Sequence, residues 1–176
     1  MRTVFICWAV IFFCCSFVTE KNDYIQWSST TSLTFADFKG KIPPGTSPKS
    51  AVNSSIAISY QISQVPGEVP NVVIFNVFDR NTSWIQVKTN EILDLQQINF
   101  DYSELYARKI RKGIKEMNQK KITDKQKYIQ KISEVAGKLS KIKNNNNILL
   151  HDQPHLIKLM KKDISDSLKL YSDFTK

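Results

Sequence analysis

Two histidines and an aspartate in one short segment are the residues of this chain best suited to metal chemistry. His151 and His155 stand four residues apart, with Asp152 between them. Imidazoles at that spacing on one helical face, completed by a carboxylate, can hold Zn²⁺. Pro154 is expected to begin a helix, which leaves His151 outside it, so the two imidazoles would not share a face. We therefore expect an ordinary surface loop and keep a loop-borne metal site as the alternative.

A longer segment places polar residues on a predicted helix. Residues 92–111 read ILDLQQINFDYSELYARKIR, and residues spaced by three and four predict a helix with one inward stripe. Glu104 and Arg108 are four residues apart, in the order that favours an ion pair along a helix. The inward stripe comprises Leu95, Ile98, Asn99, Tyr102, Leu105, Tyr106, Ile110, Ile114 and Met117.

The same segment resembles the active-site helix of a predicted family of secreted zinc proteases, best known from Bacteroidetes-type bacteria. The family pattern is H-E-Q-x-H-F-D followed by E-L-x-A-R, in which the histidines bind zinc and the glutamate takes a proton from the bound water. In that register, Leu95, Gln96 and Asn99 replace the first histidine, the glutamate and the second histidine. A leucine cannot bind zinc and an amide cannot act as a base. We predict that these positions are non-functional in catalysis and that the chain uses no cofactor.

The resemblance extends upstream of this helix. The segment LTFADFKGKIPP, residues 33–44, and the pair Ser83-Trp84 follow in the family's order, so the similarity spans roughly residues 24 to 115. It implies a zincin-like fold, and no third metal ligand can be placed downstream. We expect a structural role for the residues that match the family pattern, which are Trp27, Asp37, Phe38, Trp84, Phe100, Asp101, Glu104 and Arg108.

The first residues are typical of a secretory signal peptide. An apolar run ends at Cys15 and is shorter than the roughly 20 residues that span a membrane. Small residues at positions 14 and 16 favour cleavage after Ser16, giving a leader of residues 1–16, or of 1–19 for later cleavage. Bulky phenylalanines disfavour the alternative, lipid attachment at Cys14 or Cys15. We predict export to the periplasm or the medium.

Residues 17–176 are predicted to form one α+β domain with a small antiparallel sheet. Residues 55–63 alternate between apolar and polar types, and the apolar run at 72–78 follows a turn rich in proline and glycine. This pattern predicts two paired strands. The residues expected on the buried face of the first strand are Ile56, Ile58, Tyr60 and Ile62.

The part of the domain from 119 to 176 is rich in lysine, diverges from the family, and is predicted to form two further helices. Thr123 and Gln126 have the spacing of a capping box. That helix is expected to end at the asparagine run 144–147, and the last helix to begin near Pro154. The sheet and about three helices complete the predicted fold.

The net charge and its distribution along the chain suggest an anionic partner. The net charge is +9, and it becomes +8 when Arg2 leaves with the leader. The excess lies between Arg108 and Lys162, where a lysine-rich face could meet an anionic membrane surface or a polysaccharide. Tyr128 is the lone aromatic residue among these lysines, which argues against stacking on nucleic acid.

We therefore expect an exported, monomeric, non-catalytic domain that binds a protein or peptide of the cell envelope or serves there as a structural component. Two alternatives stay open. One is a metal-dependent peptidase or hydrolase with its site relocated to His151, Asp152 and His155. The other is a basic module that binds anionic surfaces.

Overall fold

The computed structural model describes residues 23–48, 50–152 and 155–175. The predicted leader, with Cys14 and Cys15, lies outside the described residues. None of the helices in the described part of the chain is both long enough and apolar enough to cross a membrane.

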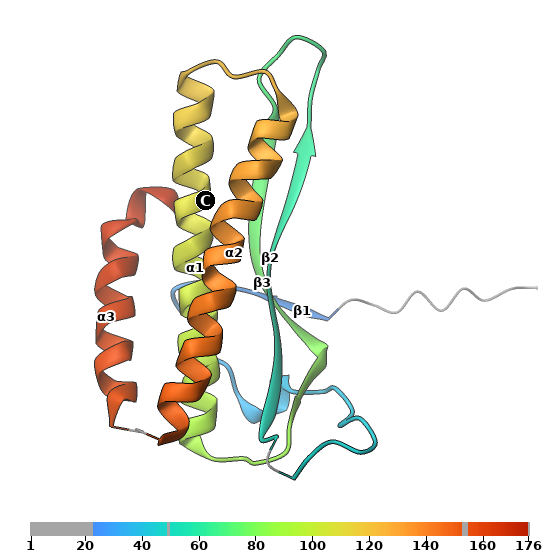
Figure 1. Cartoon of the computed structure of the whole chain (residues 1–176), viewed down its shortest axis with the longest axis vertical. Coiled ribbons are helices and arrows are strands. Elements are labelled where there is room, and N and C mark those ends of the chain that lie inside the picture. Colours follow the sequence, from blue (N-terminus) through green and yellow to red (C-terminus); the bar gives the residue numbers. More distant parts are fainter. Residues whose placement is uncertain (1–22, 49, 153–154, 176) are drawn as a thin grey trace, which may run out of the picture.

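A three-stranded antiparallel sheet comes first in the chain (Figure 1). Its strands are β1 (Tyr24–Gln26), β2 (Val52–Ser63) and β3 (Asn71–Ile85), in the order β1-β3-β2. A short 3₁₀ helix, η1 (Phe35–Asp37), lies between β1 and β2. The predicted antiparallel pair is confirmed, and both of its strands are longer than predicted. The three residues of β1 were not predicted, because so short a strand shows no periodic pattern.

Ser83 explains the irregular register of the hairpin formed by β2 and β3. The pairing shifts between Asn53 and Ser55. There the Ser83 hydroxyl accepts a hydrogen bond from the Ser55 N–H at 2.9 Å and donates one to the Asp79 carbonyl at 2.6 Å. A buried side chain thus replaces part of the backbone ladder.

Three helices follow: α1 (Asn90–Gln119), α2 (Lys125–Asp152) and α3 (Leu156–Leu170). A final 3₁₀ turn, η2 (Ser172–Phe174), ends the described chain. The first helix is capped by Thr89, whose side chain accepts a hydrogen bond from the Ile92 N–H at 3.3 Å.

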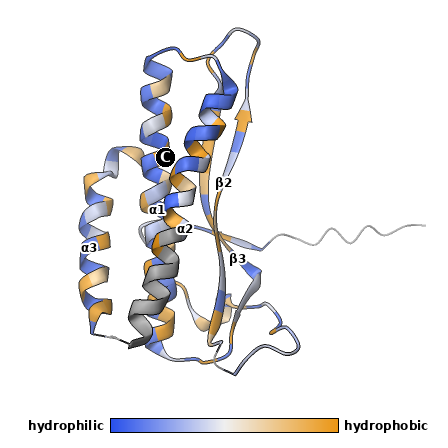
Figure 2. Cartoon of the chain, viewed as in Figure 1, coloured by the Kyte–Doolittle hydropathy of each residue, from blue (hydrophilic) through white to orange (hydrophobic). Residues whose placement is uncertain are grey.

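Helix α1 is the centre of the molecule, with the sheet, α2 and α3 all packed against it (Figure 1). One core cluster joins Ile74 of β3 to α1 and α2, and a second joins Phe78 of β3 to Phe100 of α1. A third joins Ile98 of α1 to Ile157 of α3. Hydrophobic and hydrophilic residues alternate along the helices (Figure 2), as expected where each helix buries only part of its surface. The fold is therefore α+β, with a small three-stranded antiparallel sheet followed by three packed helices. The predicted order of a small antiparallel sheet and about three helices is confirmed, while the third strand, β1, was not predicted.

Several local predictions were wrong. Helix α2 continues through Asn144–Asn147 to Asp152, because an asparagine costs a helix at most about 0.7 kcal/mol relative to alanine. His151 and Asp152 therefore lie in the last turn of α2 rather than in a loop. At the start of α2, the Gln126 N–H donates to the Asp124 carboxylate at 2.9 Å. Asp124 therefore caps this helix in place of the predicted Thr123.

The burial predicted for β2 holds at Ile58 and Ile62, which pack against the core. Ile56 packs against the second cluster. The burial predicted for Tyr60 was wrong, because 40% of its surface is exposed. Alternation assigned Tyr60 to the inner face, but a large ring at the edge of a sheet reaches solvent even where its smaller neighbours do not.

Candidate functional site

The three helix positions at which the resemblance implied zinc chemistry in other proteins serve packing and local structure here. Leu95 packs against the cluster between α1 and α3. Gln96 is 4% exposed, and its Oε1 accepts a hydrogen bond from the Ser54 hydroxyl at 2.7 Å. Asn99 is 2% exposed, as expected for the inward stripe. A hydrocarbon and two amides, one already bonded to a hydroxyl, do not fit a zinc ion, so no chemistry is derived through a metal here.

The family-pattern residues that follow these positions gather at a different place. Trp27, in the loop after β1, donates from Nε1 to Asp101 Oδ1 at 2.8 Å. Gln97 Nε2 donates to the same oxygen at 2.9 Å, and Gln97 Oε1 accepts from the Leu33 N–H at 2.8 Å. Asp101 and Gln97 thus hold the loop after β1 against α1. Sequence reasoning missed Gln97, since nothing local distinguishes it from Gln96.

A buried ion-pair network lies one turn further along α1. Glu104 is 2% exposed and contacts Arg108 Nε at 3.0 Å and Arg111 Nη1 at 2.9 Å. Arg108 Nη1 donates to the Leu168 carbonyl of α3 at 2.7 Å. The predicted ion pair between Glu104 and Arg108 is confirmed, and the contribution of Arg111 was not foreseen.

Arg111 ties three parts of the chain together. Its Nη1 donates to the Phe174 carbonyl at 3.1 Å, and its Nη2 donates to the Ile74 carbonyl of β3 at 3.0 Å. A guanidinium group presents five donors in a planar fork and can serve several acceptors at once. The Arg108 guanidinium also lies 5.2 Å from the centre of the Trp27 ring, a cation–π distance. The network therefore joins α1, β3, α3 and the loop after β1.

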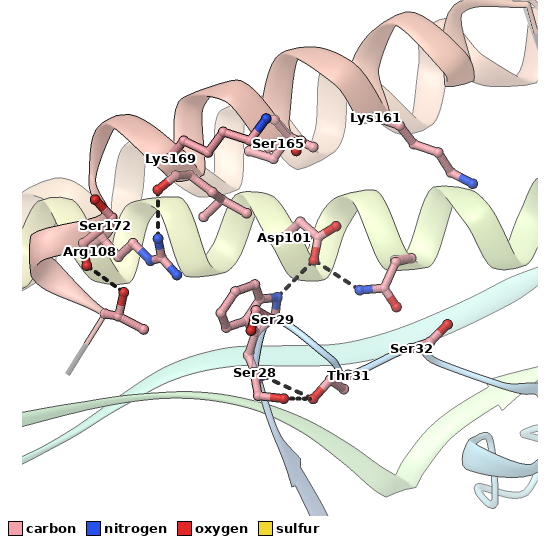
Figure 3. Close-up of a pocket in the computed structure, with 15 residues that line it drawn as sticks. Ser28, Ser29, Thr31, Ser32, Asp101, Arg108, Lys161, Ser165, Lys169 and Ser172 are labelled. Carbon is pink, nitrogen blue, oxygen red and sulfur yellow. Dashed lines mark hydrogen bonds between the residues drawn. The ribbon is translucent and has the colours of Figure 1, made fainter.

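These residues border an open cleft between the loop after β1, helix α1 and helix α3 (Figure 3). Its volume is about 600 Å³. Seven of its fifteen lining residues carry a hydroxyl group, and the charged residues on its lining are Asp101, Arg108, Lys161 and Lys169. The hydroxyl residues are Ser28, Ser29, Thr31, Ser32, Ser165, Ser172 and Thr175.

Asp101 differs from the other charged groups of this cleft. Lys161 pairs with Asp94 at 2.7 Å and Lys169 with Asp166 at 3.2 Å, while Arg108 has Glu104. No cationic side chain of the described residues forms an ion pair with Asp101, and both hydrogen bonds to it end on Oδ1. Figure 3 shows the other carboxylate oxygen directed toward α3. Asp101 is therefore the acceptor that a ligand can use.

Burial changes the acidity of this carboxyl group. Loss of hydration raises the pKa of Asp101 above its ordinary value of 3.8, and the nearby negative charge of Glu104 raises it further. The hydrogen bonds from Trp27 and Gln97 and the charge of Lys161 act in the opposite direction without cancelling the effect of burial. The carboxylate thus binds a proton more readily than an exposed aspartate does.

The remaining family-pattern residues support the frame at a distance from this cleft. The Asp37 carboxylate accepts from the Thr34 N–H at 2.7 Å and pairs with Arg80 at 3.2 Å, which holds η1 near β3. Phe38 packs edge-on against Phe78 with ring centres 5.2 Å apart. Phe100 lies 6.1 Å from Phe78 in the same cluster.

Trp84 lies in β3, where it pairs with Asn53 across the register shift. The side chains of His151 and Asp152 lie outside the described residues, and His155 stands immediately before α3. Within the described ranges, no three histidine, cysteine or acidic side chains gather as metal ligands would. His151 and His155 do not share one helix, because α2 ends at Asp152 and α3 begins at Leu156.

Searches against protein-family models, curated proteins and solved structures found no match to this chain.

Proposed function

We propose that this chain is an exported, non-catalytic binding domain that keeps the frame of the secreted zinc-protease-like family, and that its ligand site is the cleft at Asp101. In this proposal the fold is zincin-like, and Leu95, Gln96 and Asn99 mark the lost zinc site. The ligand is a peptide of the cell envelope that carries a cationic group.

This proposal rests on the contrast between the residues at the catalytic positions of the family pattern and the other residues of that pattern. The positions that would perform catalysis are a leucine and two amides, whereas the family-pattern residues Trp27, Asp101, Glu104 and Arg108 form one connected network beside the cleft. A fold retained without its chemistry would keep its structural residues, and here they also shape a cavity. Function is argued from that cavity rather than from the fold.

The charge arrangement supports a cationic group on the ligand. Arg108, Lys161 and Lys169 each contact a carboxylate, of which Glu104 and Asp166 are shared with Arg111 and Lys162. By contrast, no cationic side chain of the described residues pairs with Asp101. Asp101 has an accessible oxygen and a partly buried position, where an ammonium group is bound more strongly than at an exposed carboxylate. Surrounding hydroxyls can bind the backbone of a peptide.

The Asp101→Asn variant tests this proposal with little structural change. The asparagine Oδ1 can still accept from Trp27 and Gln97, while the second oxygen becomes an NH₂ group without charge. The probe is the tripeptide Ala-Lys-Ala with blocked termini, compared with its acetyl-lysine counterpart by calorimetric titration of the mature protein. We expect the parent protein to bind the lysine peptide, and the variant to bind it about tenfold more weakly, the value of one charged hydrogen bond.

The matched control is Asp173→Asn, which removes an equal charge from an exposed position in η2. It should leave the affinity unchanged. Equal affinity of the parent protein for the two peptides would contradict the proposal, and so would equal weakening in both variants.

A further inference from the structure

A second, basic groove lies between α1 and α2 beside Tyr171, and it shares no lining residue with the cleft at Asp101. Its volume is about 280 Å³, at the small end for ligand sites in proteins. Four lysines line it: Lys109 and Lys112 from α1, and Lys131 and Lys138 from α2. The inference drawn from it does not depend on the proposed function.

The positive charges of this groove are only partly balanced. Lys131 and Lys138 share one carboxylate, Glu134, at 3.5 Å and 2.6 Å. Glu116 is the acidic residue on the lining itself. Within the described part of the chain, neither Lys109 nor Lys112 forms an ion pair. Four ammonium groups therefore face two carboxylates.

Aromatic rings hold the two unpaired ammonium groups in place. Lys109 Nζ lies 4.5 Å from the centre of the Tyr106 ring and 5.9 Å from that of Tyr171. Lys112 Nζ lies 5.8 Å from the centre of the Tyr171 ring. Cation–π contacts orient ammonium groups without neutralising their charge. Both groups thus stay available to an anion, and less side-chain entropy is lost when one binds.

The packing of the two helices also brings the lysines together. Gly113 of α1 lies under the Lys131 side chain, and a Cβ atom at this position would stand 3.0 Å from Lys131 Cε. The missing side chain lets the stem of Lys131 cross α1 closely. Burial lowers the pKa of Lys109, and the positive charge of Lys138 lowers it further. Like charges therefore repel one another inside the groove. A bound anion would relieve this repulsion.

We propose that this groove binds a phosphate monoester group, with Lys109, Lys112 and Lys138 as its charged donors. A monoester carries close to two negative charges at neutral pH, which matches the excess of two ammonium groups over carboxylates. A carboxylate would neutralise only one of them. The small volume suits a single head group rather than a long polymer.

The test uses the mature protein with methyl phosphate, a monoester, as a free phosphate probe at low salt. We expect saturable binding by the parent protein and a loss of about tenfold or more in the Lys109→Gln, Lys112→Gln double variant. The matched control removes two exposed lysines elsewhere, Lys41→Gln and Lys158→Gln, and should bind as the parent does. Thermal unfolding verifies that each variant folds, and the single variant Lys112→Glu, at an exposed position, repeats the test.

Vesicles separate the two sources of such a group. Retention by phosphatidic acid vesicles, with release by methyl phosphate, would support a lipid monoester, whereas binding of methyl phosphate alone would support a free phosphate ester. Phosphatidylglycerol vesicles, which carry a diester, should retain the protein less. Absence of binding to every probe would overturn the proposal, as would equal losses in the groove and control variants.

Discussion

Asp101 is costly to the fold, and it is the residue at which we propose that a ligand binds. It holds Trp27 and Gln97 through one oxygen and leaves the other directed into the cleft. The raised pKa of Asp101 means that its ionised form is less stable in the folded protein than in water. Such a penalty is typical of positions kept for binding rather than for stability.

The pH dependence of stability tests this account of Asp101. Its pKa is higher in the folded than in the unfolded state, so the ionised group destabilises the fold above the folded pKa. That penalty disappears as the pH falls through this pKa to below 3.8. Asp101→Asn removes the titration and keeps both hydrogen bonds. We expect the variant to be more stable than the parent at pH 7 and equally stable below pH 3.8 in urea unfolding. A difference that stayed the same at both pH values would contradict it.

Glu104 behaves differently from Asp101, because its negative charge is enclosed by two guanidinium groups. Arg108 and Arg111 both contact it, and their remaining donors reach backbone carbonyls in α3, β3 and η2. Two charged hydrogen-bond donors on Glu104 Oε1 make this buried charge tolerable. The residue therefore links elements of the fold rather than facing a ligand.

At the scale of elements, α1 organises the molecule because it is packed on three sides. Ile98 is fully buried where α1 meets Ile157 of α3. The cleft itself is lined by other residues of α3, among them Ile164 and Leu168, so α3 must stay docked for the cleft to exist. The stability of this contact is thus a condition for binding as well as for folding.

Shortening Ile98 to alanine should reveal the contribution of this contact. Deleting a buried side chain of this size costs about 2 to 5 kcal/mol, through lost burial and the cavity left behind. Leu159→Ala, on the exposed side of α3 with 57% of the leucine surface accessible, should change stability by no more than about 0.5 kcal/mol. Urea unfolding of the two variants measures both values. Similar losses in the two variants would show that α3 is not held by this cluster.

At the scale of the whole molecule, a domain with a zinc-protease-like frame is proposed to work without zinc. Its candidate sites are the cleft at Asp101 and the lysine groove, which lie on different surfaces of α1. A central helix packed on three sides can offer one groove at each of its junctions with other helices. Two ligands of opposite charge could thus bind one small domain.

Zinc analysis of the intact mature protein tests this view. The protein is purified without chelator and without a histidine-rich tag, then analysed before and after saturation with Zn²⁺ and desalting. We expect no stoichiometric zinc, because Leu95, Gln96 and Asn99 offer a zinc ion no imidazole, thiolate or carboxylate. One zinc per chain would contradict this expectation. Replacing His151 and His155 with alanine would then decide whether the metal belongs to the alternative site at those residues.

Local patterns predicted much of the fold. The hairpin of β2 and β3 and the course of α1 follow from periodicity, which depends on residues only a few positions apart. The ion pair between Glu104 and Arg108 follows from helical spacing alone. The end of α2 could not be predicted in this way, because the intrinsic cost of asparagine is small enough for the surrounding structure to outweigh.

The sequence by itself determined the strand and helix types of the main elements and the absence of imidazole and carboxylate groups at Leu95, Gln96 and Asn99, since both depend on residue identity and short-range spacing. Only the tertiary structure decided that Trp27 meets Asp101, and that Arg111 joins α1 to β3 and the C-terminal turn. These contacts connect segments far apart in the chain, so packing selects them rather than any local preference. The two proposed ligand sites exist for the same reason, because each lies where separate elements meet.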